Sequence, residues 1–381
     1  MSENSRFIYF DNNATTPVHP KVLETMLPYF SESFGNAASI TYGLGLQAKH
    51  AVDQAKENVA QIINCIEQEI SFTSGATEAL NTTIKGIFWR YHVKGKHFVT
   101  LPTEHKAVLD TLKWIATQGA EITYLNVDKN GLIDLEELTL AIRTDTVAVI
   151  TMLANNETGV LQPIQEIAKI VHDKNSILIC DATQAVGKIK VDVQELGIDV
   201  MALSAHKFYG PKGVGALYLR RRSPRVTIDA LLHGGGHERG NRSGTLNVPG
   251  IVGLGKASEL VPEFIKDYEE KILPIRKYLE EEIVKNNIGK IIAQDVNRLP
   301  NTINVQLYHI KAETVIKCIK HRIGISTGSA CSSADPQPSH VLLAMGLTKE
   351  QAHHTIRISL GIMNTLEDAQ EFMSLLKNIE N

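Results

Sequence analysis

Short apolar runs alternate with longer amphipathic stretches through the middle of this chain. The runs have the length of buried strands, and the stretches between them repeat apolar residues at helical spacing. This alternation favours an α/β fold built on a mostly parallel sheet. We predict strands at 7–10, 69–73, 96–101, 121–125, 146–153, 176–180, 200–203, 302–308 and 355–360. We predict helices at 18–30, 51–62, 74–89, 106–117, from Asp134, at 163–171, 257–285 and 312–319.

Polar side chains follow the apolar runs where each strand should end. Ligands of open α/β sheets bind outside the carboxyl ends of the strands. This one rule gathers eight residues at a common edge: Thr77, His105, Asn156, Asp181, Gln184, Ser204, His206 and Lys207. Eight unrelated helix caps are a poorer explanation than one shared binding site.

Lys207 follows the apolar run Val200–Leu203 and precedes a turn with Gly210, Pro211 and Gly213. A lysine withdrawn from bulk water loses its proton more easily and becomes a nucleophile suited to Schiff bases. A lone lysine after a strand is more often a surface residue. The hypothesis that Lys207 forms a Schiff base therefore depends on the residues that the fold brings near it.

Two further features of the sequence support a Schiff-base role for Lys207. A predicted helix begins with Ser74, Gly75, Ala76 and Thr77, and free N–H groups and the helix dipole there create an anion site, although simple capping is an alternative. Asp181 provides a carboxylate at a strand end. A lysine, a carboxylate and a phosphate cup are what pyridoxal phosphate (PLP) requires.

Three apparent motifs fail in context. Gly43–Ala48 fits a dinucleotide fingerprint but lacks a preceding buried strand. The stretch Asn126–Glu137 resembles a calcium loop, yet a strand precedes it and Asp134 explains it better as a helix cap. Gly250–Ala257 resembles a phosphate loop but has Ala257 where Ser or Thr must bind magnesium.

Charge and cysteine content narrow the function classes. The net charge of −3 predicts no nucleic-acid or membrane partner. The four cysteines show no CxxC spacing, so we expect neither a disulfide framework nor a structural metal site. With no signal-peptide layout or transmembrane run at the N-terminus, we expect a cytoplasmic protein.

Cys331 differs from the other cysteines in its surroundings. We expect Cys180 and Cys318 to be buried in apolar runs, whereas Cys331 lies in the small, polar loop STGSACSSADPQP at 326–338. A thiol in such a loop has the profile of a reactive cysteine. Arg357, among apolar neighbours, requires an anionic partner.

Together these residues resemble the cysteine desulfurases, a class V aminotransferase-related group of fold-type I PLP enzymes. The resemblance extends nearly end to end and includes FTSGATE, TEHKAVLD, NNETG, DATQAVGK, SAHKFYGPKG, GGGHERGNRSGTL and STGSACSSA. It implies a large PLP-binding domain at 16–256. The small α+β domain would comprise 1–15 and 257–381 and carry the cysteine loop. It also implies a homodimer that acts on L-cysteine and passes sulfur to an acceptor protein.

The resemblance also implies roles for individual residues. Lys207 would hold PLP as a Schiff base and move protons at the substrate α-carbon. Asp181 would pair with the pyridinium nitrogen, Gln184 would bind the ring hydroxyl, and His105 would stack on the ring and act in acid–base steps. Asn156 would lie near the ring. Ala76, Thr77, Ser204, His206 and a partner subunit's Thr245 would hold the phosphate, and Arg357 and Asn36 would fix the substrate carboxylate.

Cys331 would attack the sulfur of the cofactor-bound cysteine, releasing alanine and leaving a persulfide on itself. It could also ligate an iron–sulfur cluster transiently. Its surroundings resemble the long-loop subgroup of iron–sulfur-assembly and nitrogen-fixation desulfurases. Ala205 replaces a common Gly, and the chain stops soon after its last helix. Desulfurases for DNA phosphorothioation or tRNA thiolation, and selenocysteine lyases, stay open as alternatives.

Overall fold

The computed structural model describes residues 6–327 and 337–380. Seven strands form the main sheet in the order β2-β8-β7-β6-β5-β3-β4. Five neighbouring strands of this sheet run parallel, and β8 runs antiparallel to both β2 and β7. Its strands are β2 (Ile70–Thr73), β3 (His97–Thr100), β4 (Glu121–Tyr124), β5 (Thr146–Met152), β6 (Ile177–Asp181), β7 (Val200–Ser204) and β8 (Gly215–Leu219). The predicted mostly parallel α/β fold is confirmed.

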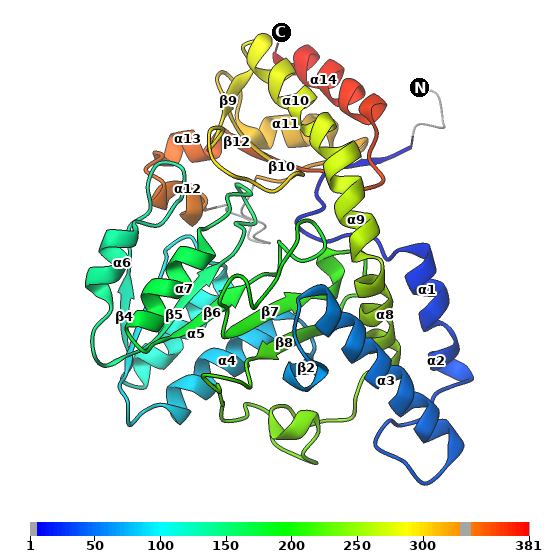
Figure 1. The fold of residues 1–381 in the computed structure, drawn as a ribbon. Helices are drawn as coiled ribbons and strands as arrows, with labels where there is room; N and C mark the ends of the chain where they lie inside the picture. The colour runs from blue at the N-terminus through cyan, green and yellow to red at the C-terminus, as the bar shows by residue number, and fades with distance from the viewer. Residues whose placement is uncertain (1–5, 328–336, 381) are drawn as a thin grey trace.

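Two smaller sheets lie at one end of the molecule, beside α10, α11 and α14 (Figure 1). One is antiparallel and has the order β12-β10-β9, and in the other β1 pairs in parallel with β11. Their strands are β1 (Ile8–Tyr9), β9 (Gly289–Ile291), β10 (Thr302–Leu307), β11 (Ile323–Gly324) and β12 (Thr355–Ser359). The N-terminal segment therefore joins the C-terminal part of the chain.

Fourteen α-helices occur in the part of the chain that the structure describes. Those before the main sheet ends are α1 (Pro20–Met26), α2 (Pro28–Ser31), α3 (Gly43–Ile62), α4 (Ala76–Arg90), α5 (Lys106–Thr117), α6 (Leu135–Ala141) and α7 (Ile164–Asp173). Those after it are α8 (Val248–Glu259), α9 (Val261–Asp267), α10 (Leu273–Lys285), α11 (Ala312–Ile319), α12 (His340–Ala344), α13 (Lys349–His353) and α14 (Leu366–Glu380).

Helices cover both faces of the main sheet, which explains why its strands read as continuous apolar runs. Along β6, Ile177 and Ile179 belong to a core with side chains of α4 and α5. Leu178 and Cys180 belong to a second core that includes α3, α7 and α8. Because side chains alternate along a strand, these two cores lie on opposite faces. Every strand of this sheet except the edge strand β4 is buried along its length, so a ligand can approach the central strands at their ends.

The structure corrects several sequence-based expectations. Residues 18–30 form two helices because Pro28, which lacks a backbone N–H, begins the second. The predicted helix at 257–285 is the run α8, α9 and α10 with a π-helical turn between the last two, and Pro262 and Pro274 stand near the start of α9 and α10. Strand β8 was missed, because its apolar residues directly follow the glycine-rich turn.

Cys318 is exposed, so the prediction that it is buried was wrong. It lies on α11, whose buried residues are Ala312, Val315 and Ile319. These repeat at helical spacing and define one face of the helix, and Cys318 falls outside that face. Cys180 is buried, as predicted.

Candidate active site

A cavity of about 570 Å³ opens at the carboxyl ends of β5, β6 and β7. Most residues singled out from the sequence line it: Ala76, Thr77, His105, Asn156, Asp181, Gln184, Ser204, His206, Lys207 and Arg357. Asn36 and Thr245, both within the described part of the chain, are not among its lining residues. Cys331 lies outside the described residues. The residues predicted to lie at the carboxyl ends of the strands thus line a single cavity.

Lys207 ends a short 3-10 turn that directly follows β7. Its Nζ donates hydrogen bonds to the backbone oxygens of Asn13 at 2.6 Å and Ala14 at 2.9 Å. Burial, assisted by the positive charge of Arg357, lowers the pKa of Lys207 to about 8. A substantial share of the amine is therefore neutral near physiological pH, as a Schiff-base nucleophile requires.

Asp181 is the last residue of β6, and its carboxylate accepts a hydrogen bond from the Thr183 backbone N–H at 3.0 Å. The Thr183 hydroxyl also lines the cavity and is buried, yet it has no hydrogen-bond partner among the described residues. Buried hydroxyls are nearly always paired. An orphaned hydroxyl beside a carboxylate fits a cavity shaped for a polar ligand.

His105 forms the N-cap of α5. Its Nδ1 accepts a hydrogen bond from the Ala107 backbone N–H at 3.1 Å, so a neutral ring carries its proton on Nε2. Burial lowers the pKa of His105. The ring is thus held as a neutral imidazole with a defined tautomer, on the same cavity as Lys207.

The N-terminus of α4 forms one end of the cavity. Its N-cap, Gly75, has φ +152°, a value that favours glycine, and provides no side-chain cap. The first helical residues, Ala76 and Thr77, line the cavity together with Ser204 and Lys212. Uncapped N–H groups, a hydroxyl and a cation make a cradle that fits a phosphate group.

His206 lies in the same turn as Lys207, and its Nδ1 is 3.1 Å from the Thr15 hydroxyl oxygen. Burial, together with the charges of Lys207, Lys212 and Lys188, lowers the pKa of His206 to about 4. The ring is therefore neutral at physiological pH. It can contribute a hydrogen bond to a bound anion but not a charge.

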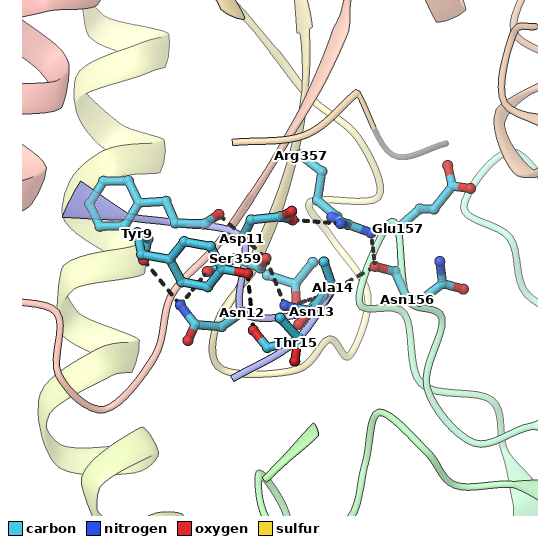
Figure 2. Close-up of polar contacts among 12 residues, drawn as sticks. Tyr9, Asp11, Asn12, Asn13, Ala14, Thr15, Asn156, Glu157, Arg357 and Ser359 are labelled. Atoms are coloured by element: carbon cyan, nitrogen blue, oxygen red, sulfur yellow. Dashed lines mark hydrogen bonds and ion pairs between the residues drawn. The ribbon is translucent and has the colours of Figure 1, made fainter. Parts of the chain in front are cut away.

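Arg357, on β12, approaches the cavity from the small sheet (Figure 2). Its guanidinium forms an ion pair with Asp11 at 2.6 Å and donates to the Asn156 backbone oxygen at 3.1 Å. The required anionic partner is thus Asp11. The buried Nε of Arg357 has no partner among the described residues and can donate to an anionic ligand.

Asn13 is a residue of the site that the sequence analysis did not predict. Its backbone oxygen accepts hydrogen bonds from Lys207 and, at 2.9 Å, from Gln184 Nε2. Figure 2 shows it beside Asn156 and Ser359. The strand before it, β1, belongs to a separate two-stranded sheet with β11, so the rule for the main sheet did not include Asn13.

Comparisons with known proteins agree with this geometry. The aminotransferase class-V model matches residues 8–372. A protein named cysteine desulfurase IscS from Anaeromyxobacter sp. (strain Fw109-5) is 47% identical over 97% of this chain and 91% of its own length. One of the same name from Methanosarcina thermophila is 45% identical over 100% of this chain and 93% of its own. The solved structure of a NifS-like protein superposes with a TM-score of 0.91 at 38% identity, covering 98% of this chain and 99% of the other.

Proposed function

This chain belongs to the aminotransferase class-V family, and we propose that it is a PLP-dependent cysteine desulfurase. The observation that carries the proposal is one cavity lined by Lys207, Asp181 and His105, with the anion cradle of α4 at one end. Relatives named cysteine desulfurase, matched over nearly the whole chain, support the substrate L-cysteine.

The residues of the cavity fit PLP. Lys207 would hold its aldehyde carbon, and Asp181 its pyridinium nitrogen. The amides of Ala76 and Thr77, with Ser204 and His206, would hold its phosphate, while Gln184 and Asn156 lie on the same cavity for the ring. Bound PLP supplies an electron sink that makes the bonds at the substrate α-carbon, and then the C–S bond, labile.

The chain's own groups then move protons and sulfur. Lys207 and His105 exchange protons at the substrate, because both have lowered pKa values and can be neutral near pH 7. Arg357, which lines the cavity, binds the substrate carboxylate. The Cys331 thiolate attacks the substrate sulfur, and the C–S electron pair stays with the substrate, which takes up a proton to become alanine. The sulfur remains on Cys331 as a persulfide.

The experiment that tests the activity measures alanine and sulfide from purified protein, L-cysteine and a thiol reductant. We expect equal amounts of both, and a visible absorption band from the bound cofactor. Absence of alanine in protein that carries the band would overturn the activity. Turnover of selenocysteine with none of cysteine would indicate a selenocysteine lyase instead.

We further propose the division into a large domain at 16–256 and a small one formed by 1–15 and 257–381. The main sheet falls in the first range, and β9, β10 and β12 in the second. We propose a cytoplasmic enzyme that passes its sulfur to an acceptor protein, for iron–sulfur cluster assembly or another sulfur-transfer pathway. Among the described helices, none has the length and apolar character that spanning a membrane requires.

We also propose a homodimer, in which Thr245 reaches the partner's phosphate cradle. Several large apolar side chains of the segment 23–46 are exposed: Leu23, Leu27, Phe30, Phe34, Ile40 and Leu46. Exposed apolar groups in such number favour a protein interface. Sedimentation equilibrium should give twice the chain mass of 42.0 kDa, and a monomer at micromolar concentration would contradict the dimer.

The pKa of Lys207 predicts how cofactor attachment depends on pH. Only the neutral amine attacks an aldehyde, and a pKa of about 8 makes this form dominant above that pH. The attachment rate to cofactor-free protein should rise about tenfold per pH unit below pH 8 and level off above it. Stopped-flow absorbance would measure the rate. A simple alkylamine, with a pKa of about 10.4, is the control, and the same midpoint in the protein would contradict the prediction.

A further inference from the structure

Lys188 is a second buried lysine next to the active site. Its exposed fraction is 0%, and it follows the β6 strand end on the same segment as Gln184. Fully buried lysines are rare unless paired with a charge. None of the ion pairs within the described ranges includes Lys188, and its Nζ instead donates to Gln184 Oε1 at 2.6 Å and Asn13 Oδ1 at 3.1 Å.

The contact with Gln184 fixes which way its side-chain amide points. An amide has a donor end and an acceptor end of nearly the same shape, so only its partners decide the orientation. The Lys188 amine offers hydrogens to Gln184 Oε1, and Gln184 Nε2 donates to the Asn13 backbone oxygen at 2.9 Å. The same oxygen accepts from Lys207 Nζ at 2.6 Å. The donor end of Gln184 therefore lies on the Lys207 side.

This orientation leaves one N–H of Gln184 for a ligand. Gln184 Nε2 carries two hydrogens, and among the described residues only Asn13 accepts from it. Gln184 and Lys207 both line the cavity. A molecule attached to Lys207 would thus meet a hydrogen-bond donor at Gln184, whereas a flipped amide would present an oxygen and repel an ionised acceptor.

The contact between Lys188 and Asn13 likewise fixes the orientation of the Asn13 side-chain amide, which bonds to the small sheet. Asn13 Oδ1 accepts from Lys188 and from Asn301 Nδ2 at 3.2 Å, so Asn13 Nδ2 must face the other way. That nitrogen donates to Thr302 Oγ1 at 2.9 Å and to the Asn156 backbone oxygen at 3.1 Å. The Asn156 oxygen also accepts from Arg357 (Figure 2).

We propose that Lys188 is a positioning residue that orients the amides of Gln184 and Asn13 around Lys207, so that Gln184 presents a donor to an ionised oxygen of the bound cofactor. This inference rests on the proposed PLP site. Burial, with the charges of Lys207 and Arg357, also holds the pKa of Lys188 well below its usual range. A neutral amine has two N–H groups, which matches its two acceptors.

The test is a spectral pH titration of the cofactor-loaded protein. In Lys188→Met the Gln184 amide loses its fixed orientation, and the ionised ring oxygen loses its donor. The midpoint of the absorption change should therefore rise by about 0.5–1 pH unit. Gln184→Leu should produce a similar rise. The double variant should match Gln184→Leu alone, because Lys188 acts through Gln184.

Lys56→Met is the matched control, since Lys56 is also a buried lysine but pairs with Glu238 at 3.0 Å, and neither residue lines the cavity. It should lose stability without moving the midpoint. An unchanged midpoint in folded Lys188→Met, or fully additive shifts, would overturn the proposal. If Lys188→Met does not fold, Lys188→Leu, which also lacks a donor, carries the same titration, with a midpoint shift of the same sign expected and an unchanged midpoint again contradicting the proposal. A wild-type protein with no cofactor band would instead refute the PLP site itself.

Discussion

Lys207→Ala is expected to lower alanine formation from L-cysteine by at least ~10³-fold and to remove the absorption band of the lysine-bound cofactor. Lys207 lies on the cavity, and its Nζ is fixed by the backbone oxygens of Asn13 and Ala14. Its lowered pKa supplies a neutral amine. Alanine at this position has neither the nucleophile nor the proton carrier, so both effects should appear together.

The measurement combines a visible spectrum with an assay for alanine. Lys190→Ala is the control, because Lys190 is an exposed lysine that pairs with Glu195 on the surface. It should keep the band and the rate. A Lys207→Ala protein with the wild-type spectrum would mean that another amine holds the cofactor, and the assignment of Lys207 would be wrong.

The sequence was sufficient to predict the edge of the main sheet that carries the cavity. Asp181 and Lys207 each follow a short apolar run, and a parallel sheet brings such ends together without knowledge of the loops. Thr77 and His105 could be placed for the same reason, since each begins a helix directly after a strand. Local patterns determine all four positions.

The contribution of the N-terminal segment could not be predicted in this way. Asn13 reaches the cavity because β1 pairs with β11, and because its side chain bonds to Thr302 and its backbone N–H to Ser359. These contacts join the two ends of the chain. No local periodicity encodes them, and only the packed small sheet shows that a polar turn is part of the site.

Lys188 was missed for a related reason. Nothing in the local sequence AVGKIK marks its lysine as buried, and its complete burial depends on two amide oxygens from different segments. Cys318 is the opposite case, a residue predicted to be buried that is exposed. It lies in an apolar stretch that forms the helix α11, and only one face of this helix is buried. Burial of single polar residues is a tertiary property that the pattern of the chain does not specify.

The described residues on both sides of Cys331 contact the cavity region. Ser326 exchanges backbone hydrogen bonds with Arg357, at 3.2 and 2.6 Å. On the far side, the Ser339 hydroxyl donates to the buried Glu157 carboxylate at 2.5 Å, and His340 lines the cavity. Cys331 follows Ser326 by five positions, a span that extended chain covers in less than about 18 Å. The described residues that flank Cys331 thus adjoin the cavity, which supports the proposal that its thiol acts on the substrate.

Cys331→Ser is therefore expected to lower sulfide release by at least ~10³-fold while leaving the cofactor band intact. A serine hydroxyl stays protonated and cannot take over the sulfur, whereas Lys207, Asp181 and His105 are unchanged and can still bind cofactor and substrate. Addition of L-cysteine should still perturb the spectrum, without turnover. Cys318→Ser, which replaces an exposed thiol on α11, is the matched control and should stay within about twofold of wild type. Full sulfide release from Cys331→Ser would show that another group accepts the sulfur.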